Sequence, residues 1–289
     1  MMKLSHESKR RLGVGIGAFV LIIGLVFGTS RILIHFDEPW NLGAVAIDWP
    51  GKGSGNYSAR PQQLSSETFD ADAFTSLDLD VTSGTVEVKR VSGGPVRVIE
   101  SGRVAKGVSA SDAATQNLVE VKGSTLKIGQ FDCDDKRVID RTVTIELPRE
   151  VAENMAGITA NVGLGDLTVT GIACHDLDLT LDSGDVEFTG TVTDTLNAEV
   201  GLGDATFELN QAPAKSMDVS VGTGDVEITV PNSTGFKASL TLGCGDFESD
   251  FLPDNYDGEM VSGLEFDNGD KSATYRFEVG LGDMSFDSE

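Results

Sequence analysis

Aspartates that directly follow a glycine are the residues of this chain whose type and spacing could carry chemistry. Asp166 in VGLGDLTVTG (162–171) is one of them. A GxG turn can hold a phosphate, and an exposed carboxylate can act as a general base or bind a cation. The same Gly-Asp pair recurs in similar segments along the chain, and in these segments its aspartates are Asp166, Asp185, Asp204, Asp225, Asp246 and Asp283.

Phosphate binding does not fit these glycines. A phosphate-binding GxG opens a helix whose N-terminus faces the anion, whereas each GxG here is followed by alternating apolar residues typical of a strand. The chain also has 22 Lys and Arg against 46 Asp and Glu, and its formal net charge is −24. A surface this acidic repels phosphate backbones, so we expect no nucleic-acid partner and no nucleotide cofactor.

Other catalytic residue types are sparse. The three histidines are His6, His35 and His175, and the three cysteines share no CxxC spacing. Cys174 precedes His175 directly, and neighbours on a strand point to opposite faces, so the two do not form a dyad. Because an active site needs one special place, a Gly-Asp pair in many copies favours a structural role. We therefore predict no catalytic residue and no enzyme.

Cation binding is the chemistry that remains for the aspartates. If the turns stack, the carboxylates lie about 5 Å apart, where like charges repel, raise one another's pKa values or recruit cations. Ca²⁺ is a suitable ion, since it takes carboxylate and backbone oxygens. Alternatively, each carboxylate accepts the N–H groups of its own turn. The predicted cation ladder consists of Asp166, Asp185, Asp204, Asp225 and Asp246.

Strands must position these aspartates, because the surrounding residues alternate with period two. The residue three before the aligned glycine is always Val or Leu, and the residue three after it is always Glu, Thr or Ser. The copies are LDLDVTSGTVEV (77–88), ITANVGLGDLTV (158–169), LDLTLDSGDVEF (177–188), LNAEVGLGDATF (196–207), MDVSVGTGDVEI (217–228), ASLTLGCGDFES (238–249) and YRFEVGLGDMSF (275–286).

The spacing of the copies decides the expected architecture. Successive aspartates are 19, 19, 21, 21 and 37 residues apart, so a degenerate coil is expected within residues 250–274. An antiparallel meander would also alternate, but a near-constant period favours stacked coils. We predict an all-β fold, a parallel β-helix or β-solenoid with 19–21-residue coils, capped by residues 66–157 and 250–274. In Asp166's copy, Val162, Leu167 and Val169 are expected to point inward.

An uncharged run at residues 12–30 predicts a membrane segment. It would span about 28 Å as a helix, and basic residues precede it. The positive-inside rule then predicts a single-pass protein of the bacterial cell membrane, with its C-terminal domain outside the cytoplasm. A cleaved signal peptide is the rival interpretation. The expected parts are a basic cytoplasmic tail (1–11), a signal anchor (12–30), a stalk (31–65) and an extracytoplasmic acidic solenoid (66–289).

The basic tail, the single membrane segment, the strand ending in TIELP and the Gly-Asp ladder together resemble a known family. They are similar to the bacterial membrane-anchored β-strand-repeat proteins labelled "putative adhesins", and to the LiaG-type envelope proteins. The resemblance covers residues 66–289 and is strongest over 143–289. It implies a right-handed parallel β-helix outside the membrane, a function mostly recorded as unknown, and no established catalytic or binding residues.

These observations predict a non-catalytic interaction protein, adhesin-like or accessory to envelope stress, with an envelope protein or a glycan as partner. The alternative is a carbohydrate-active β-helix enzyme that uses clustered carboxylates. Its sign would be a local break in the repeat, with unpaired carboxylates beside basic or aromatic residues. A third possibility is an anti-sigma protein or a sensor that acts through residues 1–11 on a separate cytoplasmic partner.

Overall fold

The computed structural model describes residues 36–38, 41–42, 56–129, 136–252, 262–270 and 272–289. The expected membrane anchor lies outside these residues. Among the helices of the described part, none is long and apolar enough to cross a membrane. The chain divides into two compact units, residues 1–55 and 56–289. In the first unit, β1 (Phe36–Glu38) pairs antiparallel with β2 (Asn41–Leu42).

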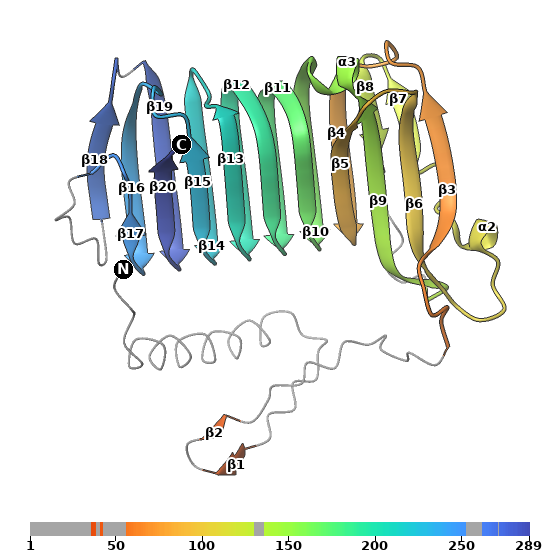
Figure 1. Ribbon diagram of the computed structural model, residues 1–289. Coiled ribbons are helices and arrows are strands. Elements are labelled where there is room, and N and C mark those ends of the chain that lie inside the picture. The colour runs from red at the N-terminus through yellow and green to blue at the C-terminus, as the bar shows by residue number, and fades with distance from the viewer. Residues whose placement is uncertain (1–35, 39–40, 43–55, 130–135, 253–261, 271) are drawn as a thin grey trace. The chain divides into compact units, whose positions relative to one another are not determined.

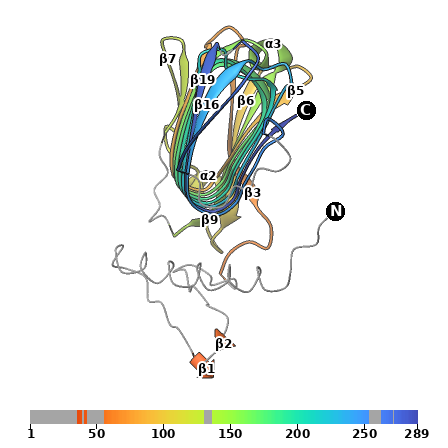
Figure 2. The same ribbon diagram turned by 90° about the vertical axis from the view of Figure 1, so that its left-hand side faces the viewer.

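The second unit is a solenoid-like stack of strands with two faces (Figures 1 and 2). The strands form one continuous sheet because β11 and β12 each run along both faces. In spatial order, face A contains β7 (Val119–Lys122), β8 (Thr125–Ile128), β4 (Ser76–Ser83), β10 (Met155–Leu164), residues 174–183 of β11 (Leu167–Ser183), residues 195–202 of β12 (Val186–Leu202), β14 (Ser216–Thr223), β19 (Ala273–Leu281), β16 (Phe236–Cys244) and β18 (Ser262–Asn268).

Face B carries the second strand of each coil. In spatial order, it contains β3 (Gln62–Phe69), β6 (Val96–Val104), β9 (Val138–Pro148), β5 (Thr85–Val91), residues 167–170 of β11, residues 186–191 of β12, β13 (Ala205–Gln211), β15 (Val226–Val230), β20 (Met284–Ser288) and β17 (Phe247–Glu248).

In the central coils, the repeat length of the sequence sets which residues pair between neighbouring coils. Leu167 pairs with Val186, 19 residues on, and Ala205 pairs with Val226, 21 residues on. All these central pairings are parallel, which confirms the predicted stacked coils and excludes the meander. The inward residues form one core in which Val162, Leu167 and Val169 are at most 2% exposed, as expected from the alternation.

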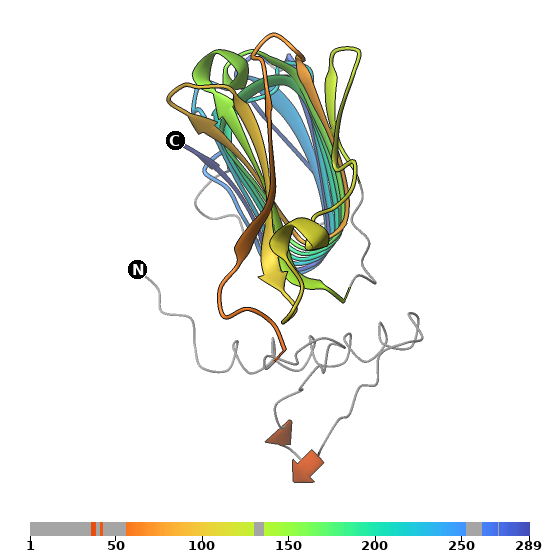
Figure 3. The ribbon, with the colours of Figure 1, turned by 90° about the vertical axis from the view of Figure 1, so that its right-hand side faces the viewer.

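Segments outside the regular repeat cover the N-terminal end of the stack. The first repeat copy is not the outermost coil, because β8 and β9 pair with β4 and β5 on their outer side. Strands β6 and β3 then extend face B in antiparallel fashion. Figure 3 views this end, with α2 (Ala110–Ala113, yellow) and β3 (orange) in front of the coils. The helix α3 (Arg149–Ala152) leads from β9 to β10. The compact unit begins at Asn56, within the expected stalk.

The C-terminal end corrects one expectation. The coil of Asp283 does not follow that of Asp246 but lies between the coils of Asp225 and Asp246, since β19 and β20 pair with β14 and β15 on one side and with β16 and β17 on the other. The degenerate coil expected within residues 250–274 is therefore wrong. The strand described there, β18, pairs antiparallel with β16 at the edge of the stack and carries the chain back to the inserted position.

Candidate functional site

The Gly-Asp turns form a single column along the edge of the stack. The turn glycines have φ between +129° and +144°, a region that favours glycine. They are also packed too closely for a side chain: a Cβ on Gly203 would overlap the carbonyl oxygen of Gly184. In spatial order the column is Gly84, Gly165, Gly184, Gly203, Gly224, Gly282 and Gly245.

The aspartates bond from coil to coil. The Oδ1 atom of Asp204 accepts the backbone N–H of Asp225 at 2.8 Å, and Asp225 accepts that of Asp283 at 2.8 Å. Asp283 then accepts the N–H of Asp246 at 2.9 Å. Asp166 and Asp185 do the same for the coils that follow them, at 3.2 and 3.0 Å. The expected bond within each turn is thus replaced by a bond to the next turn.

The structure brings the five aspartates of the predicted cation ladder into one column, and Asp283 joins them between Asp225 and Asp246. One oxygen of each carboxylate except that of Asp246 is used by a backbone N–H, which orients the carboxylate along the stack. Within the described residues, no group of three or more His, Cys, Asp and Glu side chains is arranged to hold a metal ion. The cation ladder stays a prediction.

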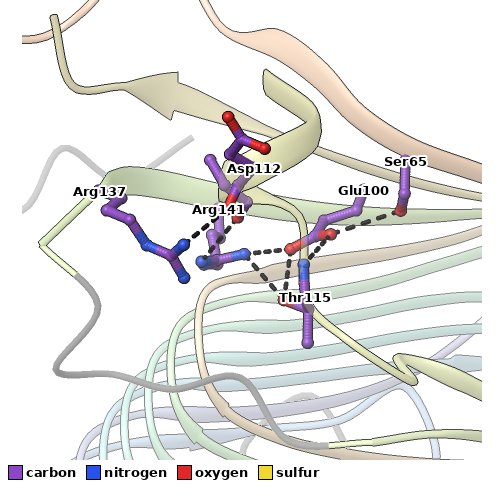
Figure 4. A network of polar contacts seen from close by, with 7 residues as sticks. Ser65, Glu100, Asp112, Thr115, Arg137 and Arg141 are labelled. Atoms are coloured by element: carbon purple, nitrogen blue, oxygen red, sulfur yellow. Dashed lines mark hydrogen bonds and ion pairs between the residues drawn. The ribbon is translucent and has the colours of Figure 1, made fainter. Parts of the chain in front are cut away.

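A buried polar network lies at the N-terminal end, where the repeat is broken (Figure 4). Glu100 of β6 is completely buried and pairs with Arg141 of β9, which is 9% exposed. Thr115 donates its hydroxyl to Oε1 of Glu100 at 2.6 Å and its N–H to Oε2 at 2.9 Å. Arg141 also donates to the carbonyl of Ala113 at the end of α2. The ion pair therefore has the additional hydrogen bonds that a buried charge needs.

Sequence reasoning missed this pair, although the sequence contains its signal. Val96, Val98 and Glu100 occupy every second position of the same strand. Because Val96 and Val98 point into the core, Glu100 should also point inward. A charged residue at an inward position predicts a buried partner of opposite charge. Both oxygens of Glu100 are occupied by hydrogen bonds, so the arrangement ties β6, β9 and the segment after α2 together.

Aromatic side chains gather at the other end of the stack. Their ring centroids lie 5.0–6.4 Å apart, and Phe236 stacks on Tyr275 at 5.2 Å. The hydroxyl of buried Tyr275 donates to the carbonyl of Pro213 at 2.9 Å, and burial raises the pKa of that hydroxyl. These rings pack inside the core, in contrast to the exposed platform that a sugar-binding groove presents. The cluster is Phe236, Phe247, Phe251, Phe266, Tyr275, Phe277 and Phe286.

Cys174 and His175 point to opposite faces, as the strand pattern predicted. Cys174 is buried, and burial, with a smaller contribution from Asp176, raises the pKa of its thiol to about 12. His175 is exposed, and its Nδ1 lies 3.0 Å from the hydroxyl of Thr193. Cys244 is an exposed free thiol, and Cys133 lies outside the described residues.

Comparisons with known proteins give one family match and several similar solved structures. A family model described as Toastrack DUF4097 matches residues 53–285. No match is found among curated proteins. One similar solved structure is a "putative cell adhesion protein" from Clostridium sporogenes, with 13% identity and a TM-score of 0.41, covering 80% of this chain and 100% of that one. Another is a "putative adhesin" from Bacteroides fragilis, with 14% identity and a TM-score of 0.36, covering 79% of this chain and 98% of that one.

Proposed function

We propose that this chain, which belongs to the Toastrack DUF4097 family, is a non-catalytic interaction protein that is anchored in the bacterial membrane and displays its coil stack outside the cytoplasm. One observation carries this proposal. The repeated Gly-Asp residues build the stack itself, and the stack presents two long faces of outward side chains in register. Such repeated rows suit an extended partner, as in other solenoid proteins.

The membrane anchor rests on the sequence of residues 12–30 and on the basic residues before them. The hydrophobic core of the described residues consists of side chains between Leu64 and Phe286, which supports display of this unit as a folded domain. An envelope protein or a glycan is the proposed partner, in adhesion or in an accessory role in envelope stress.

Display and interaction can be tested on living cells. Cells that express the full chain are compared with cells that express residues 1–55 alone, for retention on immobilised cell envelopes. Protease added to intact spheroplasts should remove the solenoid, and retention should be higher with the full chain. A solenoid that is resistant to the protease until the membrane is lysed would overturn the location, and equal retention would overturn the interaction role.

The cation ladder is a separate proposal on the turn column. Calcium binding by Asp166, Asp185, Asp204, Asp225 and Asp246 would raise the unfolding midpoint of the chain in millimolar Ca²⁺ over that in EDTA. A midpoint that is the same in both solutions would contradict specific calcium binding.

A further inference from the structure

One row of outward side chains on face B alternates strictly between a glutamate and a hydroxyl residue. The row crosses eight neighbouring strands, and each member lies directly opposite the next member on the adjacent strand. We name it the Glu–hydroxyl row. In spatial order it consists of Thr144, Glu87, Thr168, Glu187, Thr206, Glu227, Ser285 and Glu248.

The alternation depends on the inserted C-terminal coil. In chain order, Glu227 would be followed by Glu248, and two like charges would lie on adjacent strands. The inserted coil places Ser285 between them, because Ser285 pairs with Glu227 on one side and with Glu248 on the other. Adjacent strands lie about 4.8 Å apart, so the glutamates of the row repeat every ~9.6 Å.

The glutamates in the C-terminal part of the row form no ion pair with a basic side chain of the described residues. Glu187, Glu227 and Glu248 are exposed and have no ion-pair partner among the described residues. Ion pairs occur elsewhere on the stack: Glu87, at the other end of the row, pairs with Lys89, and on face A Asp218 pairs with Arg276. The surrounding sequence adds little positive charge: residues 154–289 contain 4 Lys and Arg against 26 Asp and Glu.

We infer that the Glu–hydroxyl row is a docking surface for an extended cationic polypeptide segment with a basic residue at every third position. The inference deepens the proposed interaction function and rests on it. A polyproline II segment rises about 3.1 Å per residue, so every third side chain repeats at about 9.3 Å. That repeat matches the ~9.6 Å spacing of the glutamates, and three basic residues would reach Glu187, Glu227 and Glu248 in turn.

The hydroxyl residues of the row fit the same partner. Thr168, Thr206 and Ser285 are half-buried, and their side chains are shorter than those of the exposed glutamates on either side of them. The backbone of a polyproline II segment makes no internal hydrogen bonds. The hydroxyls of Thr168 and Thr206 can donate to its carbonyls while the glutamates bind its cations.

Two peptides of equal composition test the spacing. The first is (Lys-Pro-Pro)₅, and the second carries its five lysines in one block followed by its ten prolines. Binding is measured by anisotropy on the full chain in detergent at low salt. The spaced peptide should bind about five-fold more tightly than the blocked one, and added salt should weaken it. Equal affinities, or tighter binding of the blocked peptide, would overturn the inference.

Two double variants test the place of binding. Glu187→Gln with Glu227→Gln removes two charges from the row, and Asp178→Asn with Glu199→Gln removes two exposed charges from face A. The row variant should lose about five-fold in affinity for the spaced peptide, and the face A variant less than two-fold. Equal losses of affinity in the two variants would overturn the inference, because they would show that the peptide is attracted to the negative charge of the whole surface, as a polyamine would be. Since cell retention is measured without peptides, the proposed function can stand if this docking site fails.

Discussion

At the scale of single residues, the turn column leaves room only for glycine. Gly203 has a φ of +134°, and a Cβ there would overlap the backbone of Gly184 in the neighbouring coil. Backbone strain and steric overlap therefore act together at this position, and the overlap falls on a backbone atom that is fixed by the stack. At a loop glycine with a positive φ and no close neighbour, a substitution introduces only the backbone strain.

We expect Gly203→Ala to lower the free energy of unfolding by about 3 kcal/mol or more, because both the strain and the clash are introduced. The matched control is Gly94→Ala, since Gly94 also has a positive φ, of +105°, but has nothing within 4 Å of its added Cβ. It should cost about 1 kcal/mol. Urea unfolding measures both, and equal costs would contradict the role of the stack contact.

The aspartate column predicts a difference between loss of charge and loss of the acceptor oxygen. Asp204→Ala removes the acceptor for the N–H of Asp225 and should cost about 1 kcal/mol. Asp204→Asn keeps an oxygen acceptor and removes one of several like charges, so its stability should equal or exceed that of the parent. Urea unfolding in EDTA checks both variants. An asparagine variant as unstable as the alanine variant would contradict the hydrogen-bonding role.

The thiols predict a sharp difference in reactivity. Burial raises the pKa of the Cys174 thiol to about 12, so this thiol stays protonated at pH 8 and is a poor nucleophile. Alkylation at pH 8 should modify exposed Cys244 quickly and Cys174 only after unfolding in urea. Peptide mass mapping identifies the modified residue, and rapid labelling of Cys174 in the folded chain would contradict its burial.

At the scale of elements, the regular coils could be predicted from the sequence and the two ends could not. Alternation fixes which side chains face inward, so Val162, Leu167 and Val169 were placed correctly from one segment. The position of the last coil depends on where the connection after β17 leads the chain, and no local pattern carries that information. The sequence predicts that the aspartates share a column. It does not predict that each carboxylate accepts the backbone N–H of the neighbouring turn, because that hydrogen bond depends on how the coils stack.

The buried pair at the N-terminal end also gives a prediction. Glu100→Ala leaves Arg141 buried without its carboxylate and should cost about 3–5 kcal/mol. The double variant Glu100→Leu with Arg141→Met removes both charges together. It should be less destabilised than the sum of Glu100→Leu and Arg141→Met alone, because each single variant leaves an uncompensated buried charge and the double variant leaves none. Urea unfolding of the full cycle measures the coupling, and simple additivity would contradict the ion pair.

At the scale of the whole molecule, charge and coil order are linked. Residues 56–153 contain 12 Lys and Arg against 16 Asp and Glu, while residues 154–289 contain 4 against 26. So much negative charge on closely stacked coils requires spacing of the carboxylates. The inserted C-terminal coil provides part of that spacing, since it separates Glu227 from Glu248 on face B.

Cross-linking of paired cysteines tests the coil order most directly, and the aspartate column and the Glu–hydroxyl row both depend on that order. In a background whose native cysteines are replaced by serine, cysteines are placed in pairs at Ser220, Thr241 and Glu278, and a short thiol cross-linker is added. Glu278 is the registered partner of both Ser220 and Thr241. We predict rapid cross-links for 220 with 278 and for 241 with 278, but none for 220 with 241, which lie two strands apart at ~9.6 Å. A cross-link between 220 and 241 without one between 220 and 278 would contradict the inserted coil.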